Sequence, residues 1–416
     1  MKVSVIGGGS TYTPELIEGF FDIWDKVKPL KITLLDINYE RLSIVYDFLL
    51  RMIKRAGAEI ELEMSTDLEE ALKDADFVIN QIRVGGNQAR LLDETVPLKY
   101  GVLGQETTGA GGFANALRTI PVVYGIAKKI EEVCPSAWLI NFTNPSGIIT
   151  EMLLKYTKVK SIGLCNVPIN FQKLFADLAE VSPEDVFLDY FGLNHLSFVR
   201  KVFVKGEDRT KELFLKVRER ISDEERMILD NVNMFPNYYL GYFYLREERV
   251  EEVKHKPKRA EEVLKIESDL LNLYKDPSLD KKPEELSRRG GALYSRAAVN
   301  LISALSGLKE GFQIINVKNE GAISDLPYDS VVEIPVYLQK DRFHRYVIGK
   351  LPISVRGTIQ SVKTYEELTI EAAMESSYKK ALMALTQHPL ISSMTLAKKI
   401  LDDLISTNKD YFPKLI

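Results

Sequence analysis

The sequence is poor in cysteine, histidine and tryptophan. It holds two cysteines, four histidines and two tryptophans among 416 residues. Two cysteines cannot form the disulfide network of a small secreted protein, so the composition predicts a protein of the reducing cytoplasm. No apolar run reaches the roughly 18–20 residues that a membrane-spanning helix needs. The first residues, Met1 to Gly7, predict a buried strand rather than a signal peptide.

The sequence also lacks a surplus of either charge. It has 55 Lys and Arg residues against 59 Asp and Glu residues, which gives a net charge of −4. This balance predicts no general attraction to nucleic acid or to acidic membranes. Hydrophobic residues make up 45% of the chain and charged residues 27%. The composition is therefore that of a globular protein, long enough for two or three domains.

The first 165 residues alternate short apolar runs with amphipathic segments. This alternation predicts crossover units and a parallel sheet covered on both faces. The predicted strands are Val3–Ile6, Ile32–Leu35, Ile60–Met64, Phe77–Ile82, Ala137–Phe142 and Ser161–Cys165, and the predicted helices are Thr13–Val27, Glu40–Arg55 and Leu68–Lys73.

The pattern changes after about Asn166. Extended structure is predicted at Leu188–Val204 and Val331–Leu338, helices at Thr210–Asn233, Glu247–Leu273, Gly290–Ser306, Leu368–Met383 and Leu396–Ile405, and a linker at Pro277–Pro283. We therefore expect an α/β protein. Residues 1–165 would form a Rossmann-like domain with a parallel sheet, and residues 166–416 an α+β domain for substrate, metal and oligomerisation.

A glycine-rich turn joins the first predicted strand to the first predicted helix, and it consists of Gly7, Gly8, Gly9, Ser10 and Thr11. Glycines let the backbone approach a dinucleotide pyrophosphate, and the helix N-terminus offers free N–H groups. Asp36 ends the second predicted strand, where a carboxylate binds a ribose 2′-hydroxyl and disfavours the 2′-phosphate of NADP. The third glycine of the usual fingerprint would fall at Tyr12. These features predict an NAD site, and a structural turn in another α/β protein is the alternative.

Polar segments follow three of the predicted strands. Arg83 and Arg90 follow the first, Asn144 the second, and Cys165 and Asn166 the third. Ligands of open parallel sheets bind beyond the carboxyl ends of the strands. The segment Gly104–Gly112 is predicted to be a loop that can wrap a ligand, with Glu106 as an acid or a metal-shell group. Turn chemistry explains each segment taken alone, but three at one sheet edge favour a site.

Cys165 and His195 could bind a metal together only if the fold brings them close. His195 lies in an apolar segment, where a histidine is more often a hydrogen-bonded core residue, and Cys165 could be a small apolar residue. Helix packing alone would explain the tyrosine cluster Tyr238–Tyr244. The basic run Lys254–Arg259 is either a solvated face or a phosphate site.

Six motifs, in order along the chain, resemble glycoside hydrolase family 4, the NAD- and metal-dependent glycosidases. They are Gly7–Pro14, Gly104–Thr107, Asn141–Pro145, Cys165–Pro168, Gly192–His195 and Tyr239–Tyr242. The resemblance runs over nearly the whole chain, and Tyr12 is normal for the family. It implies an architecture like that of lactate and malate dehydrogenases and favours a homodimer or homotetramer.

The resemblance also implies a reaction by oxidation and elimination, an exception to hydrolysis by two carboxylates. NAD takes a hydride from C3 of the sugar, Tyr242 removes the proton from C2, and the aglycone leaves C1. Water then adds, and the hydride returns. Cys165 and His195 hold manganese or another divalent metal, which stabilises the developing enolate as a Lewis acid.

The residue after the metal-binding cysteine distinguishes substrate classes within this family. It tends to be Asp in 6-phospho-α-glucosidases and His in enzymes of unphosphorylated α-glycosides, whereas Asn166 resembles 6-phospho-β-glucosidases. Asn166 is placed among the catalytic residues although it cannot protonate the leaving group as an acid. By similarity, Arg90 and Arg259 are candidates for the 6-phosphate and Asn144 orients the sugar, with Arg83, Arg288 and Arg289 as further phosphate candidates.

We therefore expect a cytoplasmic enzyme that hydrolyses 6-phospho-β-glucosides, either phosphorylated disaccharides such as cellobiose 6-phosphate or aryl glycosides. Within the same family, a 6-phospho-α-glucosidase or an unphosphorylated α-glycosidase is the alternative. Outside it, the alternatives are an NAD-dependent 2-hydroxy acid dehydrogenase, which would form NADH, and a non-catalytic NAD sensor.

Overall fold

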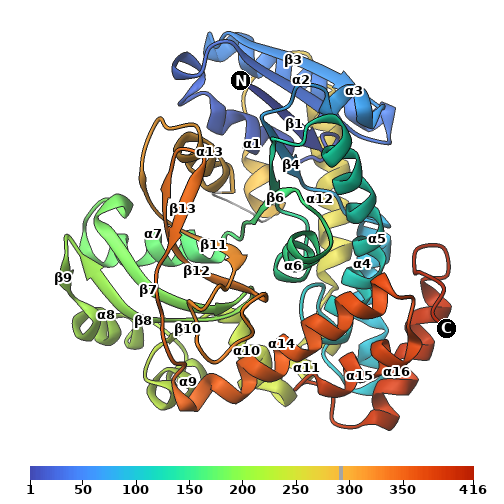
Figure 1. The fold of residues 1–416 in the computed structure, drawn as a ribbon, viewed down its shortest axis with the longest axis vertical. Helices are drawn as coiled ribbons and strands as arrows, with labels where there is room; N and C mark the ends of the chain where they lie inside the picture. The colour runs from blue at the N-terminus through green and yellow to red at the C-terminus, as the bar shows by residue number, and fades with distance from the viewer. Residues whose placement is uncertain (290–293) are drawn as a thin grey trace.

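The computed structural model describes residues 1–289 and 294–416. Its main feature is a sheet with the strand order β13-β12-β11-β6-β5-β4-β1-β2-β3 (Figure 1). The strands are β1 (Lys2–Ile6), β2 (Leu30–Leu35), β3 (Ile60–Ser65), β4 (Phe77–Asn80), β5 (Trp138–Asn141), β6 (Lys160–Gly163), β11 (Gly311–Lys318), β12 (Val331–Gln339) and β13 (Arg342–Arg345). Strands β1 to β6 are parallel, which confirms the Rossmann-like sheet. Strands β11 to β13 continue it antiparallel from the second half of the chain.

Strands β1, β2, β4 and β5 are mostly apolar, as is typical of parallel strands covered by helices on both faces, whereas the edge strand β3 alternates with glutamates. Val3, Val5, Ile32 and Leu34 are all fully buried. The α-helices of the first half are α1 (Thr13–Phe20), α2 (Tyr39–Ala56), α3 (Leu68–Leu72), α4 (Gly86–Thr95), α5 (Gly109–Val133), α6 (Ser146–Tyr156) and α7 (Val167–Ala179). None of the helices in the described ranges combines the length and the apolar character that a membrane crossing requires.

The second half is richer in helices. It contains α8 (Thr210–Arg218), α9 (Asp223–Val232), α10 (Gly241–Tyr244), α11 (Arg246–His255), α12 (Arg259–Tyr274), α13 (Tyr294–Leu305), α14 (Ile353–Met374), α15 (Tyr378–Gln387) and α16 (Met394–Thr407). Short 3-10 helices lie at Trp24–Lys26, Pro97–Tyr100, Pro183–Asp185, Tyr238–Leu240 and Glu284–Arg289.

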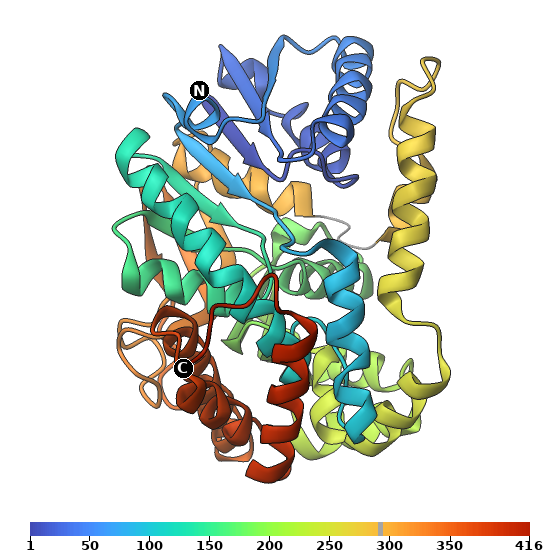
Figure 2. The ribbon, with the colours of Figure 1, turned by 90° about the vertical axis from the view of Figure 1, so that its right-hand side faces the viewer.

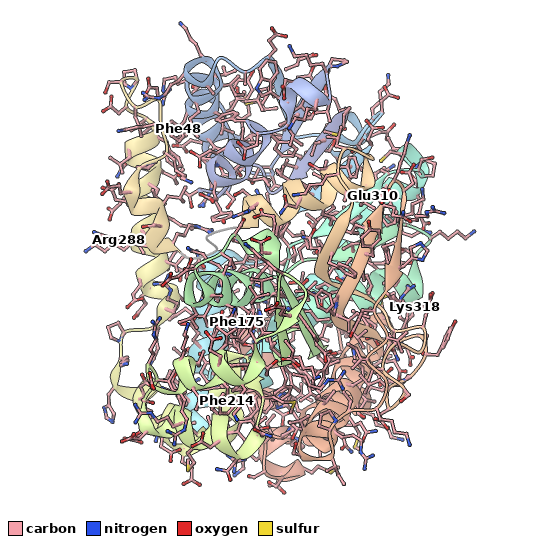
Figure 3. The ribbon with its side chains drawn as sticks, turned by 90° about the vertical axis from the view of Figure 1, so that its left-hand side faces the viewer. Phe48, Phe175, Phe214, Arg288, Glu310 and Lys318 are labelled. Atoms are coloured by element: carbon pink, nitrogen blue, oxygen red, sulfur yellow. The ribbon has the colours of Figure 1, made fainter. Side chains whose placement is uncertain are left out.

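A small antiparallel sheet lies beside the large one and has a core of its own. It consists of β7 (Val186–Leu193), β8 (Leu196–Val204), β9 (Glu207–Asp208) and β10 (Phe235–Pro236). The Phe235 ring packs on Phe175 at 4.7 Å and on Phe214 at 5.6 Å between centroids. Phe175 and Phe214 come from α7 and α8, which lie next to each other on this sheet (Figure 3). Strand β7 also packs against β12, so the turn between β7 and β8 reaches the large sheet.

Helix α12 covers the outer side of the first half of the chain. It packs against α4 and α2 and runs along this side of the molecule (Figure 2). The Tyr274 ring at its end stacks on Phe48 of α2, with 4.4 Å between centroids. The Tyr274 hydroxyl donates a hydrogen bond of 2.8 Å to the carbonyl of Thr11. A segment far along the chain thereby supports the glycine-rich turn.

Five local predictions need correction. The helix predicted at Thr210–Asn233 is two helices, α8 and α9, because Ser222 starts a new helix with a capping box. The helix predicted at Glu247–Leu273 is also two, α11 and α12, separated by extended backbone at Lys256 and Lys258. The helix predicted at Thr13–Val27 ends at Phe20 and gives way to a 3-10 turn at Trp24–Lys26. The helix predicted at Leu368–Met383 is broken at Ser376, whose φ is 55°, and Ser377 caps α15 by accepting from the Lys380 N–H. The end of the predicted loop Gly104–Gly112 is the first turn of α5. The helix predicted at Gly290–Ser306 is α13, and residues 290–293 lie outside the described part.

Candidate active site

A cavity of about 1200 Å³ opens at the carboxyl ends of the central parallel strands. Pockets for single small ligands measure roughly 300–1000 Å³, so this one has room for a dinucleotide and a sugar together. Twelve of the predicted site residues line it: Gly7, Ser10, Asp36, Arg83, Arg90, Glu106, Asn144, Asn166, His195, Tyr242, Arg259 and Arg289.

The glycine-rich turn fits a dinucleotide. The N–H groups of Gly7 and Gly8 both donate to the carbonyl of Leu35, at 2.9 and 2.8 Å, which fixes the turn on β2. The Gly9 N–H donates to Asp36 Oδ2 at 2.9 Å. A Cβ at position 9 would lie 2.8 Å from this oxygen, so only glycine lets the carboxylate take its place. Asp36 thus faces the cavity in a fixed position, as a ribose-binding carboxylate requires.

Not every predicted residue of the turn reaches the cavity. Gly8 is needed for packing, because a Cβ there would lie 2.7 Å from the Cβ of Leu34. Thr11 is fully buried under Tyr274. Gly8, Gly9 and Thr11 therefore support the turn, while Gly7, Ser10 and Asp36 line the cavity.

Arg41 and Glu267 belong to this site and were missed in the sequence. Arg41 Nε donates to the carbonyl of Gly9 at 2.8 Å, and Arg41 Nη2 lies 3.2 Å from Glu267 Oε1. Arg289 Nη2 lies 2.7 Å from the same carboxylate oxygen. Ile37 was missed as well: it follows Asp36, lines the cavity and is 99% exposed. The signal that the sequence offered for Ile37 was its place, as an apolar residue directly after the predicted ribose ligand Asp36.

The three polar segments meet at one edge of the sheet. Strands β4, β5 and β6 are neighbours, and the Asn80 side chain donates to Asn141 Oδ1 at 3.1 Å at the ends of the first two. Asn144 and Asn166 follow β5 and β6 and line the cavity. The topology thus assembles polar groups that are separated by tens of residues in sequence.

Glu106 lies between two arginines. It pairs with Arg83 and, through Oε1, with Arg90 Nη1 at 3.3 Å. Burial raises the pKa of Glu106, but Arg83 and Arg90 outweigh burial and lower it to about 2. Glu106 is therefore an anion at neutral pH. Arg90 also pairs with Glu94 at 2.7 Å, so two carboxylates compensate its charge.

The basic run contributes to the rim of the cavity. Lys256, Lys258 and Arg259 line it next to Tyr242. Arg259 Nη1 lies 2.9 Å from Glu262, and Nη2 donates to the carbonyl of Arg288 at 2.8 Å. The Arg259 side chain is 42% exposed. The run is thus more than a solvated face, because part of it borders the cavity.

Cys165 lies at the N-terminus of α7. Its Sγ accepts a hydrogen bond of 3.5 Å from the Val167 N–H. Cys165 is 3% exposed and lines a second cavity of about 340 Å³ between α7, β7, α13 and β11. Burial, followed by the negative charge of Glu333, raises the pKa of the Cys165 thiol well above its ordinary value. The thiol is therefore neutral unless a cation stabilises the thiolate.

His195 occupies the turn between β7 and β8, with a φ of 64°. Its ring stacks on Tyr239 at 4.0 Å between centroids, and its Nδ1 lies 2.8 Å from Thr107 Oγ1. Burial lowers the pKa of His195 to about 4, although Glu106 acts in the opposite direction. The imidazole is therefore neutral at pH 7, which is the form that binds metals.

Cys165 and His195 share two neighbours. Asn194 interacts with Cys165 and donates to Glu333 Oε1 at 3.0 Å. Burial raises the pKa of Tyr239, which stacks on His195, and the neighbouring Tyr238 and Cys165 add to the effect. A thiol and a neutral imidazole are suitable ligands for a divalent transition metal. Nowhere in the described residues do three His, Cys, Asp or Glu side chains form a metal site.

The tyrosine cluster connects the histidine to the cavity. Tyr239 packs against Tyr238 at 4.5 Å and against Tyr242 at 5.9 Å between ring centroids. All three tyrosines line the cavity. The pKa of Tyr242 is raised by burial and by Glu252 and Glu94, which together outweigh Arg249 and Arg90. The packing interpretation is thus incomplete, because the cluster also forms the cavity wall.

Comparison with known proteins identifies the family. The profile described as "Family 4 glycosyl hydrolase" matches residues 2–181, and the profile of its C-terminal domain matches residues 190–391. The chain belongs to glycosyl hydrolase family 4. It is accordingly a glycosidase, and the family resemblance seen in its motifs is confirmed.

Relatives within family 4 differ in their substrates. The 6-phospho-β-glucosidase BglT of Thermotoga maritima is 43% identical over 417 residues, which cover 99% of each chain. The maltose-6′-phosphate glucosidase of Fusobacterium mortiferum is 31% identical over 444 residues, covering 100% of this chain and 99% of the relative.

Solved structures share the architecture. The T. maritima 6-phospho-β-glucosidase with manganese, NAD+ and glucose-6-phosphate has a TM-score of 0.94 and 43% identity, and the match covers 99% of both chains. Malate dehydrogenase of Plasmodium falciparum has a TM-score of 0.52 at 15% identity, over 92% of this chain and 99% of the other. The second likeness concerns the fold alone and confirms the expected dehydrogenase-like architecture.

Proposed function

We propose that this family 4 glycosidase hydrolyses 6-phospho-β-glucosides with NAD and a divalent metal. The observation that carries the proposal is a single cavity that joins the dinucleotide turn at Gly7 and Asp36 to His195 and Tyr242. Such a cavity can hold a redox cofactor against a sugar. The T. maritima relative with manganese, NAD+ and glucose-6-phosphate supports the same combination of ligands.

The β-anomer is favoured over the α-anomer on two grounds. Identity to the T. maritima 6-phospho-β-glucosidase is 43%, against 31% to the F. mortiferum maltose-6′-phosphate glucosidase. Asn166, which lines the cavity, is also the residue type expected after the cysteine in 6-phospho-β-glucosidases.

We place Cys165 and His195 as the metal ligands, and Gly7, Ser10 and Asp36 as the residues that contact NAD, with Gly8, Gly9 and Thr11 shaping the turn. When bound, NAD accepts a hydride from C3 of the sugar and the divalent metal polarises the oxygens next to C2, which acidifies the C2 proton. Two features of this chain support the placement. His195 is neutral, and the Gly9 N–H holds Asp36 at the cavity wall.

Tyr242 is our candidate for the base that takes the C2 proton at its phenolic oxygen. It lines the cavity, but burial, with Glu252 and Glu94, raises its pKa despite Arg249 and Arg90. Its ionisation would therefore depend on the divalent metal when bound. Asn166 has no acidic proton, and its amide is suited to orient sugar oxygens. Glu106 is ionised, so it fits a metal-shell role better than that of a proton donor. Its negative charge also favours a cation near His195.

The 6-phosphate needs cations at the rim of the cavity. Arg259 and Arg90 are our candidates, and Asn144 would orient the sugar ring. Arg259 is half-exposed and pairs with one carboxylate, that of Glu262, whereas Arg90 is more buried and pairs with two, those of Glu94 and Glu106. We therefore expect Arg259 to contribute more to phosphate affinity than Arg90.

We also propose the larger context of the enzyme. Residues 1–165 and 166–416 form its two domains, it assembles as a homodimer or homotetramer, and it works in the cytoplasm. The low cysteine content supports the cytoplasmic location, and a metal-binding thiol needs reducing conditions.

Release of nitrophenol from 4-nitrophenyl 6-phospho-β-glucoside tests the function. The assay contains NAD, Mn²⁺ and reductant, and each is then omitted in turn. The α-anomer and the unphosphorylated β-glucoside serve as parallel substrates. We expect turnover of the phosphorylated β-anomer only, lost without NAD or metal. Turnover of another substrate would overturn the substrate class, and net NADH formation or NAD binding without turnover would overturn the glycosidase reaction.

A further inference from the structure

Thr107 connects His195 to a glutamine that no step of the reaction uses. The Thr107 backbone N–H donates to Gln105 Oε1 at 2.6 Å, and the Thr107 hydroxyl lies 2.8 Å from the same oxygen. On its other side the hydroxyl lies 2.8 Å from His195 Nδ1. Gln105, Thr107 and His195 thus form a continuous hydrogen-bonded chain.

The direction of each hydrogen bond in this chain follows from its first member. A backbone N–H can only donate, so the Gln105 atom that it meets must be the acceptor oxygen. The side-chain carbonyl oxygen of Gln105 has no hydrogen, so the Thr107 hydroxyl must donate its single hydrogen to it. The hydroxyl has only lone pairs left for His195, so Nδ1 must carry the hydrogen.

The neutral imidazole carries one hydrogen. An imidazole that binds a metal is in this neutral form. With the hydrogen on Nδ1, the other ring nitrogen, Nε2, keeps its lone pair and is ready to accept a metal ion. Hydrogen bonds of this kind are known to orient metal-binding histidines.

We infer that Thr107, oriented by Gln105, fixes His195 as the Nδ1–H tautomer and so prepares Nε2 to bind the divalent metal. This inference rests on the proposed function for the identity of the metal ligand. It makes Thr107 and Gln105 positioning residues, since neither needs to touch the substrate.

The loop that carries the two residues is held in place by α5. The Asn115 side chain donates to the carbonyl of Glu106 at 3.1 Å. A Cβ at Gly111 would lie 2.2 Å from the Gln105 carbonyl oxygen, and one at Gly112 would lie 2.5 Å from the Thr107 carbonyl carbon. The two glycines therefore allow a backbone contact that no other residue would permit, and this contact fixes the hydrogen-bonded chain in advance.

His388 is a second buried histidine, and its hydrogen bond predicts the opposite tautomer. It is also buried, but its Nδ1 accepts a hydrogen bond of 3.2 Å from the Leu390 N–H. Its hydrogen must therefore lie on Nε2. The two buried histidines of the described chain are predicted to be opposite tautomers.

Nitrogen NMR of histidine-labelled, metal-free protein reads the tautomers directly. The chain has only four histidines, and the variants His195→Gln and His388→Asn assign the two buried ones. We expect Nδ1–H for His195 and Nε2–H for His388. Nε2–H for His195 in the unaltered protein would overturn the inference. This readout requires neither metal nor activity, so it is independent of the proposed function.

Variants of the chain give a second test. Thr107→Val removes the acceptor, and His195 should become a mixture of tautomers, whereas Thr107→Ser should retain Nδ1–H. Gln105→Met frees the Thr107 hydroxyl to donate, which should shift His195 toward Nε2–H. Thr108→Val is the matched control, because Thr108 makes no side-chain cap to α5. A Gln105→Met spectrum identical to that of the unaltered protein would contradict the role of Gln105.

Metal affinity should follow the tautomer. Titration with Mn²⁺, in which electron paramagnetic resonance measures the free ion, should show about 10- to 100-fold weaker binding by Thr107→Val. Thr107→Ser and Thr108→Val should bind Mn²⁺ as the unaltered protein does. Equal Mn²⁺ affinity in Thr107→Val would show that the hydrogen bond does not prepare Nε2. Weak Mn²⁺ binding by all proteins, with His195 still Nδ1–H, would contradict the proposed metal site and not the tautomer.

Discussion

Arg41 of α2 and Glu267 of α12 are joined by an ion pair of 3.2 Å, from Nη2 to Oε1. Arg41 also donates to the carbonyl of Gly9, so the pair connects the glycine-rich turn to the second half of the chain. Glu267 also forms an ion pair of 2.7 Å with Arg289 and accepts a hydrogen bond of 3.0 Å from the Asn87 side chain. Burial raises the pKa of Glu267, but Arg289 and Arg41 hold it below its ordinary value.

Glu267→Gln should weaken NAD binding about tenfold, the equivalent of about 1.4 kcal/mol. The change removes the charge that orients Arg41 under Gly9. It also leaves Arg41 uncompensated near Asp36, where a 2′-phosphate would lie, so the ratio of NADP to NAD affinity should rise. Calorimetric titration of both cofactors measures the two effects. Asp269→Asn, at an exposed site of the same helix, is the control, and an unchanged affinity ratio in Glu267→Gln would refute the argument.

The ion pair between Arg41 and Glu267 could not be predicted from the sequence, whereas most of the surrounding fold could. The nucleotide half was predictable because its signals are local: the apolar runs around Val3 and Ile32, the glycines that follow, and Asp36 at a strand end. Arg41 and Glu267 are separated by more than 200 residues and carry no motif. Only the packing of α12 on α2 brings them together.

The candidate site was partly predictable for a different reason. Spacing alone left Cys165 and His195 open as a pair, and the family resemblance singled them out. The role of Thr107 could not be predicted. A threonine beside Gln105 and Glu106 gives no sign that it contacts His195, which lies in a turn 88 residues later. Side-chain partners across elements depend on register and turn geometry, which local patterns do not encode.

Air should inactivate the enzyme through Cys165. Oxidation of the thiol would remove a metal ligand, so activity should decay in air and return with reductant plus Mn²⁺, provided that oxidation stops at a reversible stage. Cys134→Ser is the matched control, since Cys134 is the other cysteine and burial raises its pKa to about 11. This variant should remain sensitive to air. Activity that is stable in air, or sensitivity that disappears with Cys134, would argue against Cys165 as a ligand.

His388 should make stability depend on pH. Burial lowers its pKa to about 3, whereas the ordinary value is 6.5. Between these values the unfolded state binds more protons, so the free energy of unfolding should fall by about 1.4 kcal/mol per pH unit as the pH is lowered from about 6 to 4. Urea unfolding of the metal-free protein measures this slope, and His388→Asn should reduce it by that amount. His255→Asn, at an exposed position, should leave the slope unchanged. Equal slopes in both variants would contradict the prediction.

Tyr242→Phe tests the proposed base most directly. The change removes one hydroxyl from the cavity wall and leaves the packing on Tyr239, at 5.9 Å, intact. A general base contributes about 10²- to 10⁴-fold, so kcat should fall by this factor while KM changes little. Exchange of the C2 hydrogen with deuterated water should fall in parallel, whereas NAD and Mn²⁺ affinities should not change. Tyr244→Phe is the control, because Tyr244 lies on the same short helix and does not line the cavity. If Tyr242→Phe lost turnover but still exchanged the C2 hydrogen at the normal rate, another group would have to be the base, and Tyr242 would act later, when the glycosidic bond breaks.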